Sequence, residues 1–439
     1  MLKVVKFGGS SLASAEQFEK VGRIIRSDVN RVYVVPSAPG KRNSKDTKVT
    51  DMLYHAYATA EAGGDVKTEI SAIKARYDEI IEGLALKLDL SDEFKTLEKN
   101  FLAMAGKDYA ASRGEYLNGL IMADYLGYEF VDPQNYIRFF EDGTLDMDTT
   151  DTLLSEKLAG TPKAVIPGFY GATPDGKVKT FSRGGSDITG SIVARAAKAD
   201  VYENWTDVSG FLIADPRIIK NPEGIETITY RELRELAYMG ATVLHEDAIF
   251  PVRKAGIPIN IRNTNAPEDR GTWIVESTLQ KSKYTITGIA GKKGFCAVSI
   301  EKDMMNSEIG FGRRVLQAFE DNGISFEHMP SGIDTLTVFV HQSEFEEKEQ
   351  SVMSEIYKST EPDNVELESD LALIAVVGRG MKSTRGTAGR IFAALAHANV
   401  NVKMIDQGSS ELNIIIGVAN EDFDAAIKAI YNIFVVTQV

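Results

Sequence analysis

Two loops rich in glycine and serine carry the side chains best suited to phosphate chemistry. The first follows an apolar strand near the N-terminus and contains Lys6, Gly8, Gly9 and Ser10. A lysine at the end of a strand, followed by backbone N–H groups at a helix N-terminus, can hold an anion. The loop has neither P-loop nor dinucleotide-loop spacing, and a Gly-Gly pair is also typical of a plain turn.

A second loop of the same kind, Ser182 to Asp187, favours the phosphate interpretation. It places a cation, Arg183, and an anion, Asp187, beside two glycines, immediately before a helical stretch. A site for both a phosphate and a carboxylate needs this mixture of charges. A helix N-cap is the simpler explanation of Asp187, since aspartate is favoured at that position in any protein.

Six segments, in a fixed order, resemble those of aspartate kinases, which have the amino-acid kinase fold. They are the segments 6–11, 37–40, 113–115, 182–187, 206–217 and 240–245. With a C-terminal regulatory region, the resemblance covers nearly the whole chain. It implies that ATP phosphorylates the β-carboxylate of L-aspartate to give 4-phospho-L-aspartate, the first step of lysine, threonine and methionine biosynthesis. Because no dehydrogenase pattern follows before Val439, we expect a monofunctional enzyme.

The composition is compatible with an enzyme that acts on small molecules. The chain has 439 residues, enough for two or more domains, and its formal net charge of -14 argues against nucleic acid or anionic membrane as a partner. The one cysteine, Cys296, lies in an apolar run and cannot form a disulfide within the chain. The sequence shows no secretory leader and no apolar run long enough to cross a bilayer, so we expect a cytoplasmic protein.

Hydrophobic periodicity predicts an α/β fold up to about Val275. Short β-branched runs such as 32–35, 164–166 and 257–261 alternate with amphipathic helical stretches. This alternation predicts a largely parallel sheet sandwiched by helices. We therefore expect a catalytic domain of the amino-acid kinase fold over residues 1–280.

A repeated order of elements follows the catalytic domain. Strand, helix, strand and strand occur from Phe295 to Val340 and recur from Leu371 to Val418, where a final helix is added. The copies resemble ferredoxin-like ACT modules, which bind amino acids between modules.

The expected module boundaries are 281–360 and 361–439. The polar stretches 342–349 and 359–369 are expected to separate the two copies. In the family one module interrupts the other, so the segment 285–290 is expected to pair with the second copy.

The resemblance gives Lys6 and Asp187 the catalytic roles. A side-chain carboxylate, with an ordinary pKa of about 3.9, is ionised at neutral pH and needs no general base to attack a γ-phosphate. Catalysis then consists of positioning and charge neutralisation. Lys6, helped by the backbone N–H groups of Gly8 and Gly9, would stabilise the transferring group, and Asp187 would orient the lysine.

On the aspartate side, the resemblance places Arg183 against the α-carboxylate and Glu115 against the ammonium group. A planar guanidinium binds a carboxylate through two parallel hydrogen bonds. Ser37 and Thr50 are carried over as further substrate contacts. Outside this ordered set, an Arg-Gly-Glu triplet would most simply form a surface ion pair.

On the nucleotide side, the resemblance implies ATP with Mg2+ as its companion, held mainly by phosphate oxygens and water. The nucleotide-binding residues it implies are Gly8, Gly9, Ser10, Thr206, Asp207 and Arg217. Two residues depart from the family pattern: Leu212 replaces an aromatic residue and Thr242 replaces a lysine. The five histidines are scattered and predict no metal site made by the protein alone; His245 is expected to be structural.

An amino-acid effector is expected at the first module. In relatives it lies near the strand-to-helix turn, here Met305 and Ser307, and near Ser325 and Glu327. Lysine is the first choice, because Glu327 could pair with its added ammonium group. Threonine is the alternative, because the turn has one residue more than the lysine-sensing pattern. Pairing of modules between chains predicts a homodimer or homotetramer.

Other functions fit parts of the pattern. An oxidoreductase on a doubly wound sheet needs G-x-G-x-x-G after its first strand, and residues 8–11 do not supply it. A non-catalytic amino-acid sensor would explain the repeats but would not need Lys6, Arg183 and Asp187. A kinase for glutamate or another acidic metabolite is the alternative within the fold, and the paired modules favour aspartate.

Overall fold

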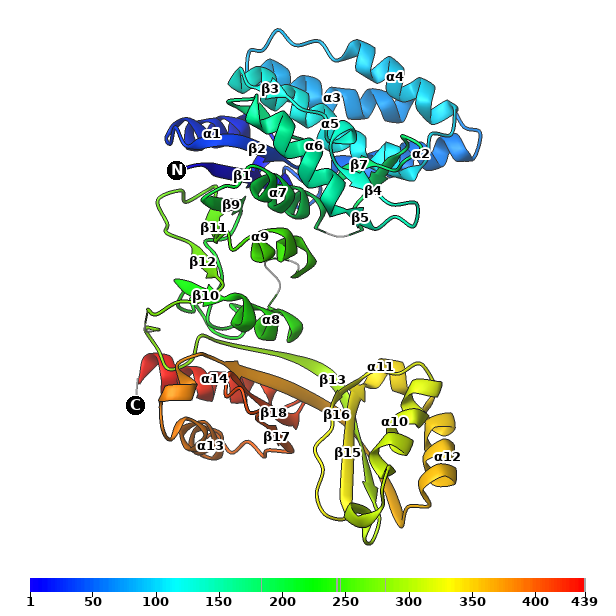
Figure 1. Ribbon diagram of the computed structural model, residues 1–439, viewed down its shortest axis with the longest axis vertical. Helices are drawn as coiled ribbons and strands as arrows, with labels where there is room; N and C mark the ends of the chain where they lie inside the picture. Colours follow the sequence, from blue (N-terminus) through cyan, green and yellow to red (C-terminus); the bar gives the residue numbers. More distant parts are fainter. Residues whose placement is uncertain (183, 242–243, 245, 281, 438–439) are drawn as a thin grey trace. The chain divides into compact units, whose positions relative to one another are not determined.

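The computed structural model describes residues 1–182, 184–241, 244, 246–280 and 282–437, and only the backbone of 246 and 247. The chain forms two compact units, each assembled from several segments (Figure 1). The N-terminal unit consists of Met1–Phe211, Gly224–Tyr230 and Thr242–Thr278. The C-terminal unit consists of Leu212–Glu223, Arg231–Ala241 and Leu279–Val439.

Eight strands form the main sheet of the N-terminal unit. They are β1 (Lys3–Phe7), β2 (Arg31–Pro36), β3 (Glu129–Phe130), β6 (Ala164–Val165), β9 (Val201–Thr206), β10 (Thr227–Thr229), β11 (Ile259–Asn263) and β12 (Thr272–Val275). Their order in the sheet is β10-β12-β11-β9-β1-β2-β6-β3. The described strands pair in parallel, apart from the antiparallel pair β11 and β12. This confirms the largely parallel sheet expected from the sequence.

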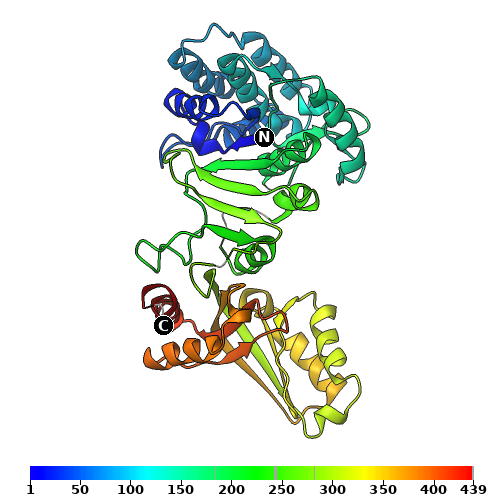
Figure 2. The ribbon, with the colours of Figure 1, turned by 60° about the vertical axis from the view of Figure 1, so that its left-hand side comes forward.

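Helices cover both faces of this sheet (Figures 1 and 2). The first face carries α1 (Ala15–Arg26), α2 (Val49–Glu61), α3 (Lys67–Gly83), α4 (Ser91–Leu102) and α5 (Lys107–Leu126). The second face carries α7 (Gly185–Ala196), which contacts α6 (Met147–Ala159) and α9 (Phe250–Lys254). Because side chains alternate along a strand, Val5 and Phe7 enter the first layer and Lys6 faces α7.

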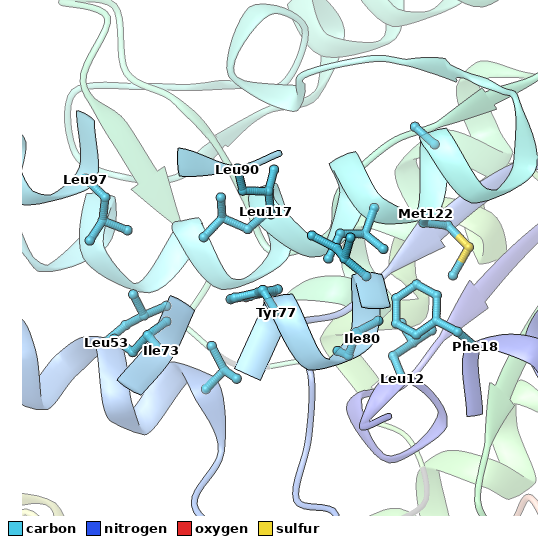
Figure 3. Packing of buried hydrophobic residues seen from close by; sticks show 14 of the residues in the cluster. Leu12, Phe18, Leu53, Ile73, Tyr77, Ile80, Leu90, Leu97, Leu117 and Met122 are labelled. Carbon is cyan, nitrogen blue, oxygen red and sulfur yellow. The ribbon is translucent and has the colours of Figure 1, made fainter. Parts of the chain in front are cut away.

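The core of the first layer holds α5 in place (Figure 3). Phe18 from α1, Leu53 from α2, Tyr77 from α3 and Leu117 from α5 are each at most 1% exposed. Burial of one such side chain stabilises the fold by roughly 1.5–3 kcal/mol. The Tyr77 hydroxyl also donates to the carbonyl oxygen of Gly114 on α5, at 2.8 Å.

A small sheet packs against the N-terminal part of α5. Its strands, in the order β5-β4-β7-β8, are β5 (Leu145–Asp146), β4 (Arg138–Phe139), β7 (Tyr170–Ala172) and β8 (Val178–Thr180). Asp108 on α5 accepts hydrogen bonds from the Thr180 hydroxyl, at 2.6 Å, and from Lys179 Nζ, at 3.0 Å. β8 leads directly to the second glycine loop, so these hydrogen bonds tie that loop to α5.

The C-terminal unit is built on one antiparallel sheet of six strands. They are β13 (Gly288–Glu301), β14 (Phe326–His328), β15 (Thr335–His341), β16 (Asn364–Val377), β17 (Met404–Asp406) and β18 (Asn413–Ala419), in the order β14-β15-β13-β16-β18-β17. One half carries α10 (Phe311–Asp321) and α12 (Glu349–Thr360), and the other carries α13 (Thr387–His397) and α14 (Phe423–Tyr431) (Figure 1). The first residues of β13, Gly288 to Ala290, pair with the end of β16, as the sequence predicted.

The two halves repeat the same turn after their first strand. In each, a short 3-10 helix, η4 (Met305–Ser307) or η5 (Met381–Ser383), is followed by a glycine in the left-handed conformation and then by a helix. The glycines are Gly310, with φ of 82°, and Gly386, with φ of 81°. Only glycine adopts this conformation without strain, so both turns depend on it.

The expectation that polar stretches separate the two copies is wrong. Residues 342–349 form the short helix α11 (Gln342–Phe345) and the start of α12, and residues 359–369 include the first half of β16. The first copy therefore also ends in a helix. Val352 and Ile356, four residues apart, form its fully buried stripe, which the surrounding polar residues of α12 mask in the sequence.

Helix α8 (Tyr230–Tyr238) follows β10 in the chain, and its residues from Arg231 on pack with the C-terminal unit. Its fully buried Glu232 accepts hydrogen bonds from the Thr287 hydroxyl, at 2.6 Å, and from the backbone N–H of Arg379, at 2.9 Å. The Arg379 guanidinium also lies 3.0 Å from this carboxylate. Among the described residues, no helix is both long and apolar enough to span a bilayer.

Candidate active site

The two predicted catalytic residues meet where β1 ends and α7 begins. Lys6 Nζ lies 2.6 Å from Asp187 Oδ1, and the lysine is only 7% exposed. Asn204 on β9 completes the cluster: its Nδ2 donates to Asp187 Oδ1 at 2.8 Å, and its Oδ1 accepts from Lys6 Nζ at 3.5 Å. A buried ammonium group is tolerated when it is paired and hydrogen-bonded in this way.

Strand register accounts for the third member of this cluster. Lys6 is the direct partner of Asn204 in the parallel pair of β1 and β9, so both side chains leave the sheet on the α7 face. Sequence reasoning missed Asn204. A polar residue within an otherwise buried strand was the available signal, because such a residue must find a hydrogen-bond partner.

The glycine loops after β1 and β2 touch through their backbones. The N–H of Gly40 donates to the carbonyl oxygen of Gly9 at 2.8 Å, and a Cβ built on Gly40 would lie 2.6 Å from the carbonyl carbon of Gly9. A side chain at Gly40 would therefore force the loops apart. The N–H of Gly8 donates to the carbonyl oxygen of Trp205 at 3.0 Å, which corrects the expectation that this N–H is free for a phosphate.

A cleft of about 590 Å³ lies beside these loops. Its walls include six of the predicted site residues, namely Gly9, Ser10, Ser37, Thr50, Glu115 and Asp207. The exposed side chains of Lys41 and Lys48 also line it, and neither lies within ion-pair distance of a described carboxylate. The cleft therefore offers positive charge to an anionic ligand, and sequence reasoning missed both lysines.

Glu115 is the buried acid of this cleft. It is 6% exposed, and its Oε2 has no hydrogen-bond partner among the described residues. Burial raises the pKa of Glu115 to about 8, against the opposing effects of the Ala38 backbone N–H and the charge of Arg113. Gly114 lets α5 come this close, since a Cβ there would lie 2.8 Å from Cβ of Ala38.

Ser37 is held in place from both sides. Its N–H donates to the carbonyl oxygen of Phe7 at 3.1 Å, and its carbonyl oxygen accepts from Asn118 Nδ2 at 2.7 Å. Asn118 is fully buried on α5, one turn beyond Glu115. Helix α5 therefore positions both Glu115, which it carries, and Ser37, which it holds through Asn118.

The remaining nucleotide-side residues divide between the two units. Thr206 ends β9, and its hydroxyl donates to the exposed Asp207 at 3.2 Å. Arg217 belongs to the C-terminal unit, where it pairs with Asp215 at 2.6 Å and lines a separate depression of about 550 Å³ with Leu212. The residues Arg183, Thr242 and His245 lie outside the described residues.

The four predicted effector residues lie in the first half of the C-terminal unit. Met305 is buried in its core, the Ser307 hydroxyl donates to the carbonyl oxygen of Met304, and Ser325 is exposed. Glu327 has two partners, because it accepts from the Tyr238 hydroxyl at 2.5 Å and lies 3.2 Å from His341 Nε2.

The described residues contain no group of three or more His, Cys, Asp and Glu side chains arranged to hold an ion. Asp187 already accepts from Lys6 and Asn204, and Asp207 is exposed on the cleft wall. These acceptors fit an ion that is held mainly by the phosphates of a nucleotide.

Comparison with known proteins decides the family. Residues 1–263 match the amino acid kinase family. Aspartokinase 3 of Bacillus subtilis (strain 168) is 40% identical over 450 residues, which cover 99% of this chain and 98% of that protein. The chain belongs to the aspartate kinase family. The crystal structure of Clostridium acetobutylicum aspartate kinase matches with a TM-score of 0.93 and 52% identity, over 99% of this chain and 100% of that one.

Family membership confirms the expected fold class. Residues 374–434 match the ACT domain, so an amino-acid kinase domain is followed by ACT modules, which serve allosteric regulation in this aspartate kinase. The oxidoreductase and the non-catalytic sensor are both excluded. A structure of E. coli aspartokinase III with aspartate and ADP, 24% identical, has a TM-score of 0.73 over 98% of this chain and 99% of that one. It supports the fold alone.

The ion pair between Lys6 and Asp187 leads to a first testable prediction. Asp187→Asn keeps the size of the side chain and removes the charge that fixes Lys6, so we expect kcat to fall about a hundredfold. The matched control is Asp148→Asn, an exposed aspartate in the first turn of α6, which should stay within about twofold of the parent. Steady-state kinetics checks this, and an Asp187→Asn enzyme with nearly full kcat would refute the role of the pair.

Proposed function

We propose that this kinase transfers the γ-phosphoryl group of ATP to the β-carboxylate of L-aspartate, giving 4-phospho-L-aspartate and ADP. The observation that carries the proposal is the buried carboxylate of Glu115, which lines the cleft with a free Oε2. A buried acid with a free acceptor oxygen is suited to an ammonium group, because the pair satisfies both partners. The substrate is then an amino acid with a second carboxylate to phosphorylate.

In the proposed complex, the substrate ammonium donates to Glu115, and the hydroxyl groups of Ser37 and Thr50 contact the same molecule. All three residues line the cleft. The lysines Lys41 and Lys48 on the same walls add positive charge for a dicarboxylate. Arg183 is assigned to the α-carboxylate by the sequence resemblance alone.

Phosphoryl transfer in this scheme needs no general base, because the β-carboxylate is already ionised. One of its oxygens attacks the γ-phosphorus, the bond from that phosphorus to the bridging oxygen breaks, and ADP leaves with the bonding electrons. Lys6 stabilises the negative charge of the transferring group, while Asp187 and Asn204 hold the ammonium in position.

The nucleotide is proposed to bind beside the first glycine loop, against Gly8, Gly9, Ser10, Thr206 and Asp207. Arg217 is assigned to its phosphates by the sequence resemblance alone. Mg2+ bound to ATP would neutralise part of the phosphate charge.

The biological setting is also a proposal. The reaction is the first step of lysine, threonine and methionine biosynthesis, in the cytoplasm, and the chains associate as a homodimer or homotetramer through their ACT modules. The catalytic domain is proposed to span 1–280 and the modules 281–360 and 361–439. Support for chain association comes from the ACT match, since such modules bind amino acids between modules.

The first test is chemical trapping of the product. With ATP, Mg2+ and hydroxylamine, L-aspartate should give a hydroxamate, because an acyl phosphate reacts with this nucleophile. L-Glutamate should give little, since its longer chain moves the carboxylate away from Lys6. Hydroxamate from glutamate and not from aspartate would assign a different acceptor, and none from either would overturn the proposed reaction.

The Glu115 carboxyl predicts a pH dependence for aspartate binding. With a pKa of about 8, Glu115 is mostly protonated at pH 7, and an ammonium group requires the ionised form. Aspartate binding at pH 7 should therefore release close to one proton, and affinity should rise with pH until about 8. Calorimetry in two buffers of different ionisation enthalpy measures this release. Glu115→Gln should abolish this proton release. The control Glu82→Gln, at an exposed position on α3, should leave it unchanged. A parent enzyme that releases no proton on binding aspartate would contradict the role of Glu115.

Lysine is the proposed effector, and a structure of E. coli aspartokinase III contains lysine together with aspartate. Glu327 could receive the added ammonium only by exchanging its hydrogen bond from Tyr238. We therefore expect Tyr238→Phe, which removes the hydrogen bond to Glu327 Oε2 and leaves His341 beside Oε1, to lower the lysine concentration for half inhibition several-fold, and Glu327→Ala to raise it. Inhibition curves for lysine and threonine check this. Full lysine inhibition of Glu327→Ala would remove Glu327 from the effector site, and inhibition by threonine alone would assign the other effector.

A further inference from the structure

Arg113 is a buried cation held by aromatic rings. It lies on α5, two residues before Glu115, and is only 7% exposed. Its guanidinium carbon lies 4.3 Å from the ring centroid of Tyr116, 4.7 Å from that of Tyr109 and 5.3 Å from that of Tyr170. Tyr109 and Tyr116 are one turn away on the same helix, and Tyr170 comes from β7 of the small sheet. We call these three rings the tyrosine cage.

The cage holds the guanidinium without neutralising it. No described carboxylate lies within 4 Å of Arg113, its Nη2 has no hydrogen-bond partner among the described residues, and its Nε donates to the neutral Ser112 hydroxyl at 3.1 Å. Buried arginines are normally paired with acids, because an isolated buried charge is costly. Ring faces offset part of that cost, because the negative face of an aromatic ring attracts a cation. Because Arg113 forms no ion pair with a described carboxylate, its positive charge is available to act on neighbouring groups.

We propose that Arg113 is a positioning residue for the amino-acid substrate: its caged charge acts through Glu115 and makes it easier for that side chain to ionise when an ammonium group binds. This inference rests on the proposed role of Glu115. The two residues flank Gly114, where α5 meets the loop after β2, so one helix carries Arg113, two rings of its cage and the acid of the cleft.

The other groups around Glu115 do not supply such a charge. Tyr54 from α2 and Tyr77 from α3 interact with it electrostatically, and burial raises the pKa of both phenols, so they stay neutral at working pH. The Ala38 N–H contributes a dipole. On the cleft walls, Lys41 and Lys48 are exposed to solvent, as is the anionic Asp207, and water screens their charges. Arg113 lowers the pKa of Glu115 from inside the protein, where screening is weakest.

The cage also keeps acids away from Arg113. The Tyr170 hydroxyl donates to Asp132 at 2.9 Å, so the nearest acid on that side is engaged by the cage itself. Tyr109 accepts from Asn100 Nδ2 at 2.6 Å, which fixes a second ring. A carboxylate in place of any ring would cancel the field at Glu115, whereas a ring face leaves it intact.

The test compares Arg113→Met with Arg113→Lys. We expect Arg113→Met to raise KM for aspartate about tenfold at pH 7 and to move the pH of half-maximal aspartate affinity up by about one unit. KM for ATP and kcat should stay within about twofold, because Lys6 and Asp187 are untouched. Arg113→Lys restores a charge and should recover most of the affinity. A merely structural role would lower kcat and stability without moving the pH profile.

A second pair of variants covers the case in which Arg113→Met does not fold. Tyr109→Leu opens the cage and keeps the charge, and should raise KM for aspartate about threefold with the same direction of pH shift. Tyr109→Phe keeps the ring and loses only the hydrogen bond from Asn100, so its KM for aspartate should lie between those of the parent and Tyr109→Leu. If none of these variants moves the pH profile while Glu115→Gln still loses aspartate, the role of Arg113 is refuted and the proposed function stands. If Glu115→Gln binds aspartate normally, the proposed substrate site itself fails.

Discussion

The ion pair between Lys6 and Asp187 fixes where the loops of the N-terminal unit lie. Both charges are largely withdrawn from water, so the end of β1 and the first turn of α7 must stay within hydrogen-bonding distance of each other. Asn204 can join them only because β9 is the parallel neighbour of β1. The glycine contact between the loops after β1 and β2 then places Ser37 and the cleft next to this pair.

Two buried cations serve the site in opposite ways. Asp187 neutralises Lys6. The pair therefore holds the lysine ammonium in a fixed position but exerts little electrostatic effect at a distance. Arg113 is caged by rings and keeps its field, which reaches Glu115. In a chain with a net charge of -14, anionic substrates gain little from the overall potential. Local arrangements of this kind must therefore supply the attraction.

Sequence reasoning succeeded where one pattern determines one structure. The parallel sheet follows from apolar runs separated by amphipathic helices, and the pairing of Lys6 with Asp187 was expected from the resemblance to aspartate kinases. It failed where tertiary contacts decide. The partners Asn204 and Asn118 depend on strand register and on the packing of α5. Helix α12 was hidden because only two of its buried residues, Val352 and Ile356, are apolar and the segment around them is polar.

Helix α8 begins where β10 ends, and from Arg231 on it packs within the C-terminal unit. It continues directly from β10, while Glu232 is bound by Arg379 of the second half of the C-terminal unit and Tyr238 by Glu327 of the first. A ligand that favours one arrangement of the modules changes the strength of these bonds and so the position preferred by the helix. The Tyr238 bond is the weaker link, because it joins partly exposed groups, whereas Glu232 is fully buried and costly to release. Of these two contacts, the Tyr238 bond is therefore the easier to exchange, and the proposed role of Glu327 depends on that exchange.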